Sequence, residues 1–464
     1  MTDLRVWLPR AVDAVDAWMA QFGSFSSHSS LHVDDDALSS AFTEFTHRLR
    51  ENYPFGHPRY VGQMLKPPHP AAVLGYVTAM LINPNNHALD GGPATAAMEK
   101  EVVGQLADMF GMRDHLGHLT SSGTIANLEA LWAARESHPG KSIAYSADAH
   151  YTHSRMCAVL GVEGIAVATD ASGRMDLDDL ERVLDQHDVG TVVATLGTTG
   201  LGALDPLPQI VERARQHGAR VHVDTAYGGF FGLIADDSRD GVETAPFAAL
   251  SDVDSIVVDP HKHGLQPYGC GAVLFADPGV GRFYVHDSPY TYFSSDELHL
   301  GEISLECSRA GAAAAALWLT LQVLPLTNAG LGQVLRANRQ GALAWTDLIK
   351  ASDSMTVFQP PALDIVTYFP SADRMSLVDE ASAALFTDAA ALPSGERVDL
   401  ATYAVGADGF TSRGHAVEAD VARARILRST VMKPESADAV PGIHATLDRL
   451  VRSHAAEHQR HGAR

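Results

Sequence analysis

Runs of strand length alternate with longer helix-forming stretches between residues 61 and 325. The clearest strand patterns lie at 142–149, 190–196, 220–223 and 255–258, and the clearest helical pattern lies at 126–134. Short apolar runs bounded by loop residues are typical of buried strands. Strands that alternate with helices form a mostly parallel sheet with right-handed crossovers. The pattern therefore predicts a large α/β domain over residues 61–325.

The two ends of the chain have different patterns. Residues 1–60 favour two helices, at 8–22 and 34–52, around a serine-rich turn. The region 326–464 starts with a helical pattern at 330–352. It continues with strand patterns at 355–359, 364–369, 399–405 and 424–432, an alanine- and aspartate-rich stretch at 370–397 that predicts helix plus loop, and a final helix at 444–454. We therefore expect an N-terminal helical segment (1–60) and a smaller C-terminal domain (326–464).

Composition narrows the class of protein. A chain of 464 residues is longer than one simple core usually organises, and 46% hydrophobic and 19% charged residues are ordinary for a soluble protein. A net charge of −22 disfavours nucleic acids and anionic membranes, which bind to basic faces. The longest apolar stretch, 310–324, ends at Pro325 and predicts a buried helix. We expect neither nucleic-acid nor membrane binding.

Cysteine and histidine usage adds two expectations. The three cysteines, Cys157, Cys270 and Cys307, suggest a reducing compartment without disulfides, and residues 1–22 lack the pattern of a cleavable signal. Together they predict a cytoplasmic protein. The closely spaced pairs His261/His263 and His150/His153 both lack the carboxylate spacing of a zinc-binding helix, so we expect no catalytic metal.

The most informative residues are an aspartate and a lysine that follow two of the predicted strands. Asp224 ends the run at 220–223, and Lys262 lies 38 residues later, just beyond the run at 255–258. This pair suits pyridoxal phosphate (PLP). A lysine amine forms a Schiff base with the cofactor aldehyde, and an acid keeps the pyridine nitrogen protonated. Each residue alone also fits a simpler role, as a surface lysine or a helix cap.

Further strand ends carry residues that complete such a site. Ser121, Ser122 and Gly123 precede a helical stretch, where backbone amides and hydroxyls bind phosphate well. His150 follows the strand at 142–149, so its ring is placed to cover one face of a pyridine, with Ala226 on the other. Thr198 ends the strand at 190–196 and offers a hydroxyl. Ligands of α/β sheets collect at the carboxyl ends of the strands, which favours one shared site over independent structural roles.

With these residues in this order, the chain resembles the group II PLP-dependent amino-acid decarboxylases, which include aromatic amino-acid, tyrosine, glutamate and histidine decarboxylases. The segments 259–262 (DPHK), 222–227 (HVDTAY) and 304–309 (SLECSR) carry the resemblance, which spans about residues 55–435. It implies a fold type I PLP enzyme with a large domain, a smaller C-terminal α+β domain and a homodimer with its active site near the subunit interface. It assigns Lys262 as the Schiff-base lysine, Asp224 as the pyridine partner and His150 as the ring stacker. It places His261 with Ser121, Ser122 and Gly123 around the phosphate.

The resemblance also implies a set of substrate-binding residues. The segment 57–63 (HPRYVGQ) is similar to a family segment in which the glutamine touches the substrate carboxylate, which points to Gln63. Arg428 resembles the C-terminal arginine that pairs with the same carboxylate, and a guanidinium fork suits that role. Contacts to the substrate side chain are expected from Tyr60, Asn85, Asn86 and His87.

The residue that protonates the substrate carbon stays open. Many members of the family carry a long loop with a proton-donating tyrosine before the segment that matches 304–309, whereas the loop here is short and has no tyrosine after Tyr292. The candidates are two tyrosines, two acids and three histidines: Tyr290, Tyr292, Asp296, Glu297, His299, His261 and His263.

The expected reaction is decarboxylation of an L-amino acid to its amine and carbon dioxide, through a Schiff base on Lys262 and a quinonoid. An aldehyde-forming oxidative reaction and a carbon–carbon lyase are alternatives on the same fold. An aminotransferase and a PLP-holding partner protein are further alternatives, which the histidine before Lys262 and the intact set of site residues disfavour. The identity of the amino acid does not follow from the sequence.

Overall fold

A computed structural model describes residues 3–235, 240–285 and 298–462. Its centre is a seven-stranded sheet in the order β1-β7-β6-β5-β4-β2-β3, in which only β7 runs against the others. The strands are β1 (Leu116–Thr120), β2 (Ser142–Ser146), β3 (Gly164–Val167), β4 (Val189–Thr195), β5 (Arg220–Asp224), β6 (Ser255–Val258) and β7 (Gly271–Phe275). The predicted α/β architecture with a mostly parallel sheet is confirmed.

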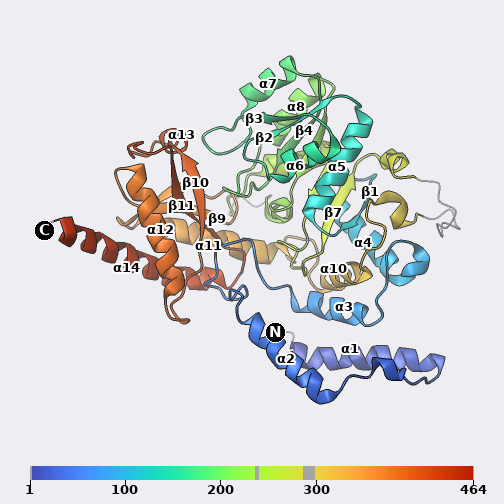
Figure 1. Ribbon diagram of the computed structural model, residues 1–464. Helices are drawn as coiled ribbons and strands as arrows, with labels where there is room; N and C mark the ends of the chain where they lie inside the picture. Colours follow the sequence, from blue (N-terminus) through green and yellow to red (C-terminus); the bar gives the residue numbers. More distant parts are fainter. Residues whose placement is uncertain (1–2, 236–239, 286–297, 463–464) are drawn as a thin grey trace.

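The helices of the large domain surround this sheet (Figure 1). They are α3 (Pro70–Met80), α4 (Pro93–Met109), α5 (Gly123–Ser137), α6 (Thr152–Leu160), α7 (Leu177–Gln186), α8 (Leu207–Gln216), α9 (Thr244–Ala248) and α10 (Gly311–Val323). Local chemistry sets several of their ends. Asp176 accepts from the amides of Asp178 and Asp179 at the start of α7, and Gly161 ends α6 with a left-handed backbone.

The C-terminal part forms a second, antiparallel sheet in the order β10-β11-β9-β8. Its strands are β8 (Met355–Gln359), β9 (Ile365–Pro370), β10 (Ala401–Gly406) and β11 (Arg423–Thr430), and its helices are α11 (Gly332–Lys350), α12 (Met375–Ala391), α13 (Ala407–Thr411) and α14 (Ser436–Gly462). All four strands were predicted close to these bounds. The last helix begins eight residues before the predicted start, because Pro441 and Gly442 hide its first turns from a propensity argument.

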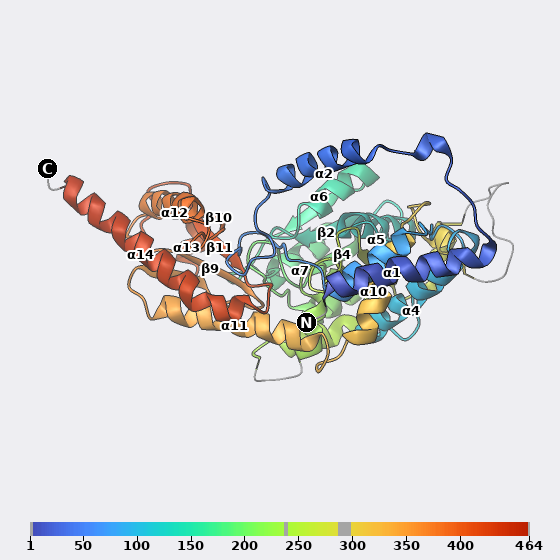
Figure 2. The same cartoon turned by 90° about the horizontal axis from the view of Figure 1, so that it is seen from below.

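The N-terminal segment forms α1 (Leu4–Met19) and α2 (Asp35–Leu49). Figures 1 and 2 show the two helices as an arm along one side of the large domain. Only Ala11 is buried in α1, and α2 buries no residue. Short 3-10 helices lie at Ala20–Phe22, Ser29–Leu31, Leu89–Gly91, Gly229–Ile234, Ala249–Asp252, Pro278–Phe283 and Leu300–Ile303.

Each sheet has its own hydrophobic core. The larger core packs strands β4, β5 and β6 against the surrounding helices, with Val192, Val223 and Ile256 fully buried. A second core joins α11, α14 and the antiparallel sheet through Trp345 and Tyr368. Among the residues that the structure describes, no helix combines the length and apolarity that a membrane span requires.

Candidate active site

A cavity of about 240 Å³ lies where the carboxyl ends of the central strands meet the start of α5. Its lining includes most of the residues that the sequence pointed to for cofactor binding: Ser122, Gly123, His150, Asp224, Ala226, His261 and Lys262. They follow β1, β2, β5 and β6, so parallel strands bring together residues that are far apart in the chain.

Asp224 is the most tightly held group in this cavity. Its Oδ2 accepts from His153 Nε2 at 2.9 Å and from Asn127 Nδ2 at 3.4 Å, and its Oδ1 accepts from the amide of Ala226 at 3.0 Å. Burial alone raises the pKa of Asp224, but the hydrogen bond and charge of His153, the Ala226 amide and Lys262 outweigh burial and lower it. Asp224 is therefore a fixed anion.

A second layer of polar residues supports this aspartate. Asn127 Oδ1 lies 2.9 Å from His222 Nε2, and His222 Nδ1 lies 2.8 Å from Ser255 Oγ. Burial lowers the pKa of His222 to about 3, so its ring is neutral at physiological pH. The sequence argument missed His153, Asn127 and His222 as supports. The alternation of strand side chains offered a signal, since His222 and Asp224 lie two apart and share one face of β5.

Lys262 reaches the same cavity from the loop after β6. Its Nζ lies 3.0 Å from Asp259 Oδ2, which is also 3.4 Å from His261 Nε2. Burial opposes the charged form of Asp259, yet Lys262 and His261 lower the pKa of this carboxyl. The Asp259 carboxylate also touches the start of α5, where a Cβ on Gly123 would lie 2.7 Å from both carboxylate oxygens. Only glycine leaves the backbone this accessible.

His150 forms a wall of the cavity. Its Nδ1 accepts from the amide of Thr152 at 3.2 Å and lies 2.6 Å from Thr152 Oγ1. The ring of Tyr151 lies against it, with centroids 4.3 Å apart. Burial lowers the pKa of His150, although the charge of Asp224 opposes this effect. The imidazole of His150 is therefore a neutral, flat ring whose position is fixed by Tyr151 and Thr152, and it is suited to stacking on another ring.

A second cavity, of about 540 Å³, adjoins the first and shares His150, Tyr151 and Thr199 with it. Gln63 and Arg428 both line it. Arg428 Nε donates to the carbonyl of Gly200 at 3.1 Å and its Nη1 donates to that of Gly62 at 3.5 Å, whereas its Nη2 is buried with no partner among the described residues. Burial lowers the pKa of Arg428, so this guanidinium is a poorly solvated donor beside the first cavity.

The first cavity fits PLP by the chemistry of its groups. It offers a lysine amine, a buried anion for a protonated pyridine, a flat imidazole and the start of a helix for a phosphate. The buried Nδ1 of His261 has no partner in the described part of the chain, so it adds a free polar atom at the same site.

Comparisons with known proteins decide the family. Residues 34–369 match the family described as "Pyridoxal-dependent decarboxylase conserved domain", which is most of the chain. The chain belongs to this family. It is a PLP-dependent carboxy-lyase, and PLP is its cofactor.

Named relatives and solved structures agree with this assignment. The decarboxylase is 29% identical to an L-tyrosine decarboxylase of Enterococcus faecium over 414 residues, covering 68% of each chain. It is 28% identical to an L-aspartate decarboxylase of Thermococcus kodakarensis over 331 residues, covering 70% of this chain and 83% of the relative. The crystal structure of mouse CSAD shares the fold, with a TM-score of 0.75 and 22% identity over 93% of this chain and 91% of that chain. The Oryza sativa TDC structure with PLP and tryptamine also shares it, with a TM-score of 0.77 and 18% identity over 97% and 98%.

Several residues expected in the decarboxylase site lie outside both cavities. The Thr198 hydroxyl accepts from the amide of Ala203 at 3.0 Å, while its neighbours Thr195 and Thr199 line the first cavity. Ser121 lies one residue outside the cavity lining, and its amide donates to Glu306 Oε2 at 2.8 Å. Thr195 and Thr199 therefore offer hydroxyls that the sequence argument did not single out.

The residues expected to contact the substrate side chain have mostly structural partners. Asn86 is buried and bonds to Glu99 and Thr95. Tyr60 is also buried, and its hydroxyl accepts from the amide of Gln63 at 3.4 Å, so it supports the segment that carries Gln63. His87 packs beside Gly91 and Gly301 rather than in either cavity.

Of the predicted proton donors whose position the structure describes, His261 lines the first cavity, whereas His299 and His263 do not. Tyr290, Tyr292, Asp296 and Glu297 lie outside the described residues. His299 is buried, with its Nδ1 3.5 Å from the amide of Leu89. His263 is buried behind Lys262 and faces away from the cavities.

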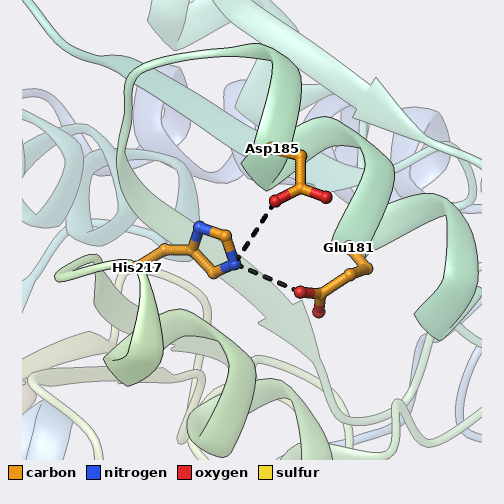
Figure 3. A group of neighbouring side chains, drawn as sticks. All are labelled: Glu181, Asp185 and His217. Carbon is orange, nitrogen blue, oxygen red and sulfur yellow. Dashed lines mark hydrogen bonds and ion pairs between the residues drawn. The ribbon is translucent and has the colours of Figure 1, made fainter.

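Among the described residues, metal-ligating atoms lie close together at Glu181, Asp185 and His217, on α7 and directly after α8 (Figure 3). This group lies away from both cavities. Glu181 is already paired with Arg213 at 3.1 Å, and His217 lies 3.2 Å from Glu181. These contacts explain the group as ion pairs on the surface.

Proposed function

We propose that this enzyme removes the α-carboxylate of an L-amino acid as carbon dioxide and releases the amine. The observation that carries the proposal is the junction of the two cavities at His150. Lys262 lines the cavity on one side of this junction, and Arg428, whose Nη2 is buried with no partner among the described residues, lines the cavity on the other. One amino acid can therefore meet the lysine and the arginine together.

Five residues hold the cofactor in this proposal. Lys262 supplies the amine for the covalent link, and Asp224 keeps a proton on the pyridine nitrogen. His150 and Ala226 cover the two faces of the ring, and the start of α5 at Ser122 receives the phosphate. Bound PLP supplies an electron sink for the electron pair that the departing carbon dioxide leaves on the α-carbon.

Arg428 and Gln63 hold the substrate carboxylate in the adjoining cavity. The guanidinium is fixed by two carbonyls, so it presents its remaining nitrogen without a loss of side-chain freedom. Lys262, freed from the cofactor by the substrate, pairs with Asp259 at the position that it already occupies. We assign the proton that reaches the α-carbon to Tyr290 or Tyr292.

The active enzyme is a homodimer in this proposal. The N-terminal arm exposes large apolar side chains, including Trp7, Trp18, Phe42 and Phe45, each more than 40% exposed. Several large apolar side chains exposed on one segment are typical of a protein–protein contact surface. A second copy covers them and brings its own residues near the substrate cavity.

The three cysteines form no disulfide, which supports a cytoplasmic location.

The test is a screen of the purified protein with PLP against the twenty common amino acids. The named relatives make L-tyrosine and L-aspartate the first substrates to try. Released carbon dioxide and the matching amine are expected, with oxygen uptake and hydrogen peroxide recorded in parallel. Peroxide and aldehyde in equal yield would instead identify the oxidative reaction. Bound PLP without carbon dioxide from any of the twenty would refute decarboxylation of common amino acids.

A further inference from the structure

A buried carboxylate of the small domain contacts the large domain directly behind the active site. Asp364, just before β9, has no exposed surface. Its Oδ1 accepts from the Tyr227 hydroxyl at 2.6 Å, and its Oδ2 lies 2.8 Å from His263 Nε2. Both partners belong to the large domain, so one side chain joins the two domains.

The hydrogen-bond pattern fixes the protons of this cluster. His263 Nδ1 lies 2.9 Å from the carbonyl of Tyr227, which can only accept, so Nδ1 carries a hydrogen. Nε2 faces a carboxylate oxygen, and a bare nitrogen there would repel it. One proton therefore lies between His263 and Asp364. The rings of Tyr227 and Phe231 pack edge-on against the imidazole, at 4.5 and 5.0 Å between centroids.

Both partners of Asp364 are chain neighbours of active-site residues. His263 directly follows Lys262, and Tyr227 directly follows Ala226, three residues after Asp224. On the small-domain side, Asp364 precedes β9, where Thr367 pairs with Arg428 of β11. The cluster thus connects the strand that carries the carboxylate-binding arginine to the two loops that carry the lysine and the ring-covering alanine.

We propose that Asp364 is a positioning residue, which acts through His263 and Tyr227 to hold the loops of Lys262 and Ala226 in the arrangement that binds PLP. The inference rests on the proposed role of Lys262. Buried ion pairs are weak contributors to stability, because desolvation offsets the attraction, so a purely structural role explains this cluster poorly. A role in fixing the positions of the loops that carry Lys262 and Ala226 explains the cluster better.

The test compares PLP binding among variants of the full-length protein. Asp364→Asn keeps both contacts, because an amide accepts from Tyr227 and donates to a neutral His263, whereas Asp364→Ala removes both. We expect Asp364→Ala to weaken PLP binding at least tenfold and to diminish the visible circular dichroism of bound PLP. Asp364→Asn should stay within threefold of wild type. Tyr227→Phe, which removes one hydroxyl, should fall between them and serves if the alanine variant does not fold.

Asp240→Ala is the matched control. Asp240 is as buried as Asp364 and pairs with Arg336 at 2.8 Å, but it contacts neither active-site loop. This variant should lower the melting temperature while leaving the affinity for PLP and the dichroism unchanged.

Unchanged PLP binding in both Asp364→Ala and Tyr227→Phe would overturn the inference and leave decarboxylation standing. An equal loss of PLP binding in Asp240→Ala would also overturn it, because the effect would then follow from stability alone. Wild-type protein that binds PLP through Lys262 but releases no carbon dioxide would sink the proposed function and leave this inference intact.

Discussion

Replacing Arg428 with methionine separates a substrate-binding role from a structural one. The side chain is 7% exposed, and of its three nitrogens only Nη2 has no partner in the described part of the chain. If that nitrogen meets the substrate carboxylate, Arg428→Met removes a buried, charge-assisted contact. Such losses cost about 3 kcal/mol, which is roughly a hundredfold in kcat/KM. We expect a raised KM to account for most of the loss.

The same substitution should have little effect on folding. Arg428→Met leaves the carbonyl of Gly200 without a donor, at about 1 kcal/mol, and leaves that of Gly62 with the Thr430 hydroxyl as its donor, but it also removes a buried cation whose desolvation opposes folding. The two effects offset each other to within about 1 kcal/mol. The melting temperature of the variant should therefore stay close to that of wild type.

Arg339 is the matched control, because its guanidinium is fully used within the protein. It donates to the carbonyls of Asp240, Gly241, Pro361 and Leu363 at 2.6 to 3.2 Å. Arg339→Met should cost about 3 kcal/mol of folding free energy, since four acceptors at about 1 kcal/mol each lose their donor and the removal of a buried cation offsets only part of this loss.

Steady-state kinetics and urea unfolding of both arginine variants decide the matter. A change of less than threefold in kcat/KM for Arg428→Met would refute the carboxylate contact. A loss of stability equal to that of Arg339→Met would show that Arg428 serves the fold instead.

Three further outcomes are expected. Lys262→Ala should abolish carbon dioxide release and the visible absorption band of lysine-bound PLP, and borohydride should fix PLP to the wild type only. Burial lowers the pKa of Lys66 from 10.5 to about 7. Between these pH values the unfolded chain binds more protons than the folded protein, so the free energy of unfolding rises with pH across this window. Lys66→Met should therefore stabilise the protein by about 2 kcal/mol in urea unfolding at pH 7, and this gain should vanish by pH 10.5. Phe42→Ser combined with Phe45→Ser should shift the sedimenting species from twice the 49.5 kDa chain mass to the monomer, whereas Phe386→Ser, at an exposed position of α12, should not.

The residues at the strand ends of the site could be predicted, because the end of a buried strand can be recognised in a sequence. Asp224 and Lys262 directly follow short apolar runs, and parallel strands must bring their carboxyl ends to one edge. The same argument located His150, Gly123 and Ala226 in the lining of one cavity. Choosing among nearby threonines was beyond it, because the local conformation at the end of β4 places Thr195 and Thr199 in the cavity lining and Thr198 outside it.

Buried polar residues were the hardest to interpret from the sequence. Asn86 and Tyr60 have residue types typical of substrate contacts, yet their side chains satisfy other buried groups. The pairing of Asn86 with Glu99 gives no sign in the chain, since only the packing of α4 creates it, whereas Tyr60 bonds to the amide of Gln63 only three residues along the chain. An isolated polar residue in a sequence is as often the partner of another buried group as a ligand for a substrate.

In the proposed complex, the amino group of the substrate meets a residue of the large domain and its carboxylate meets a residue of the small domain. The distance between these two residues could not be predicted from their spacing in the sequence. Lys262 follows a strand of the large sheet, and Arg428 belongs to β11 of the small one, 166 residues later. The distance between the amine and the guanidinium depends on how the two sheets are fixed against each other. Asp364 crosses that boundary with two hydrogen bonds, and Arg428 crosses it with its bond to Gly200. A change at either residue should therefore alter both PLP binding and substrate binding, whereas a boundary contact that reaches neither active-site loop, such as that of Asp240 with Arg336, should alter neither.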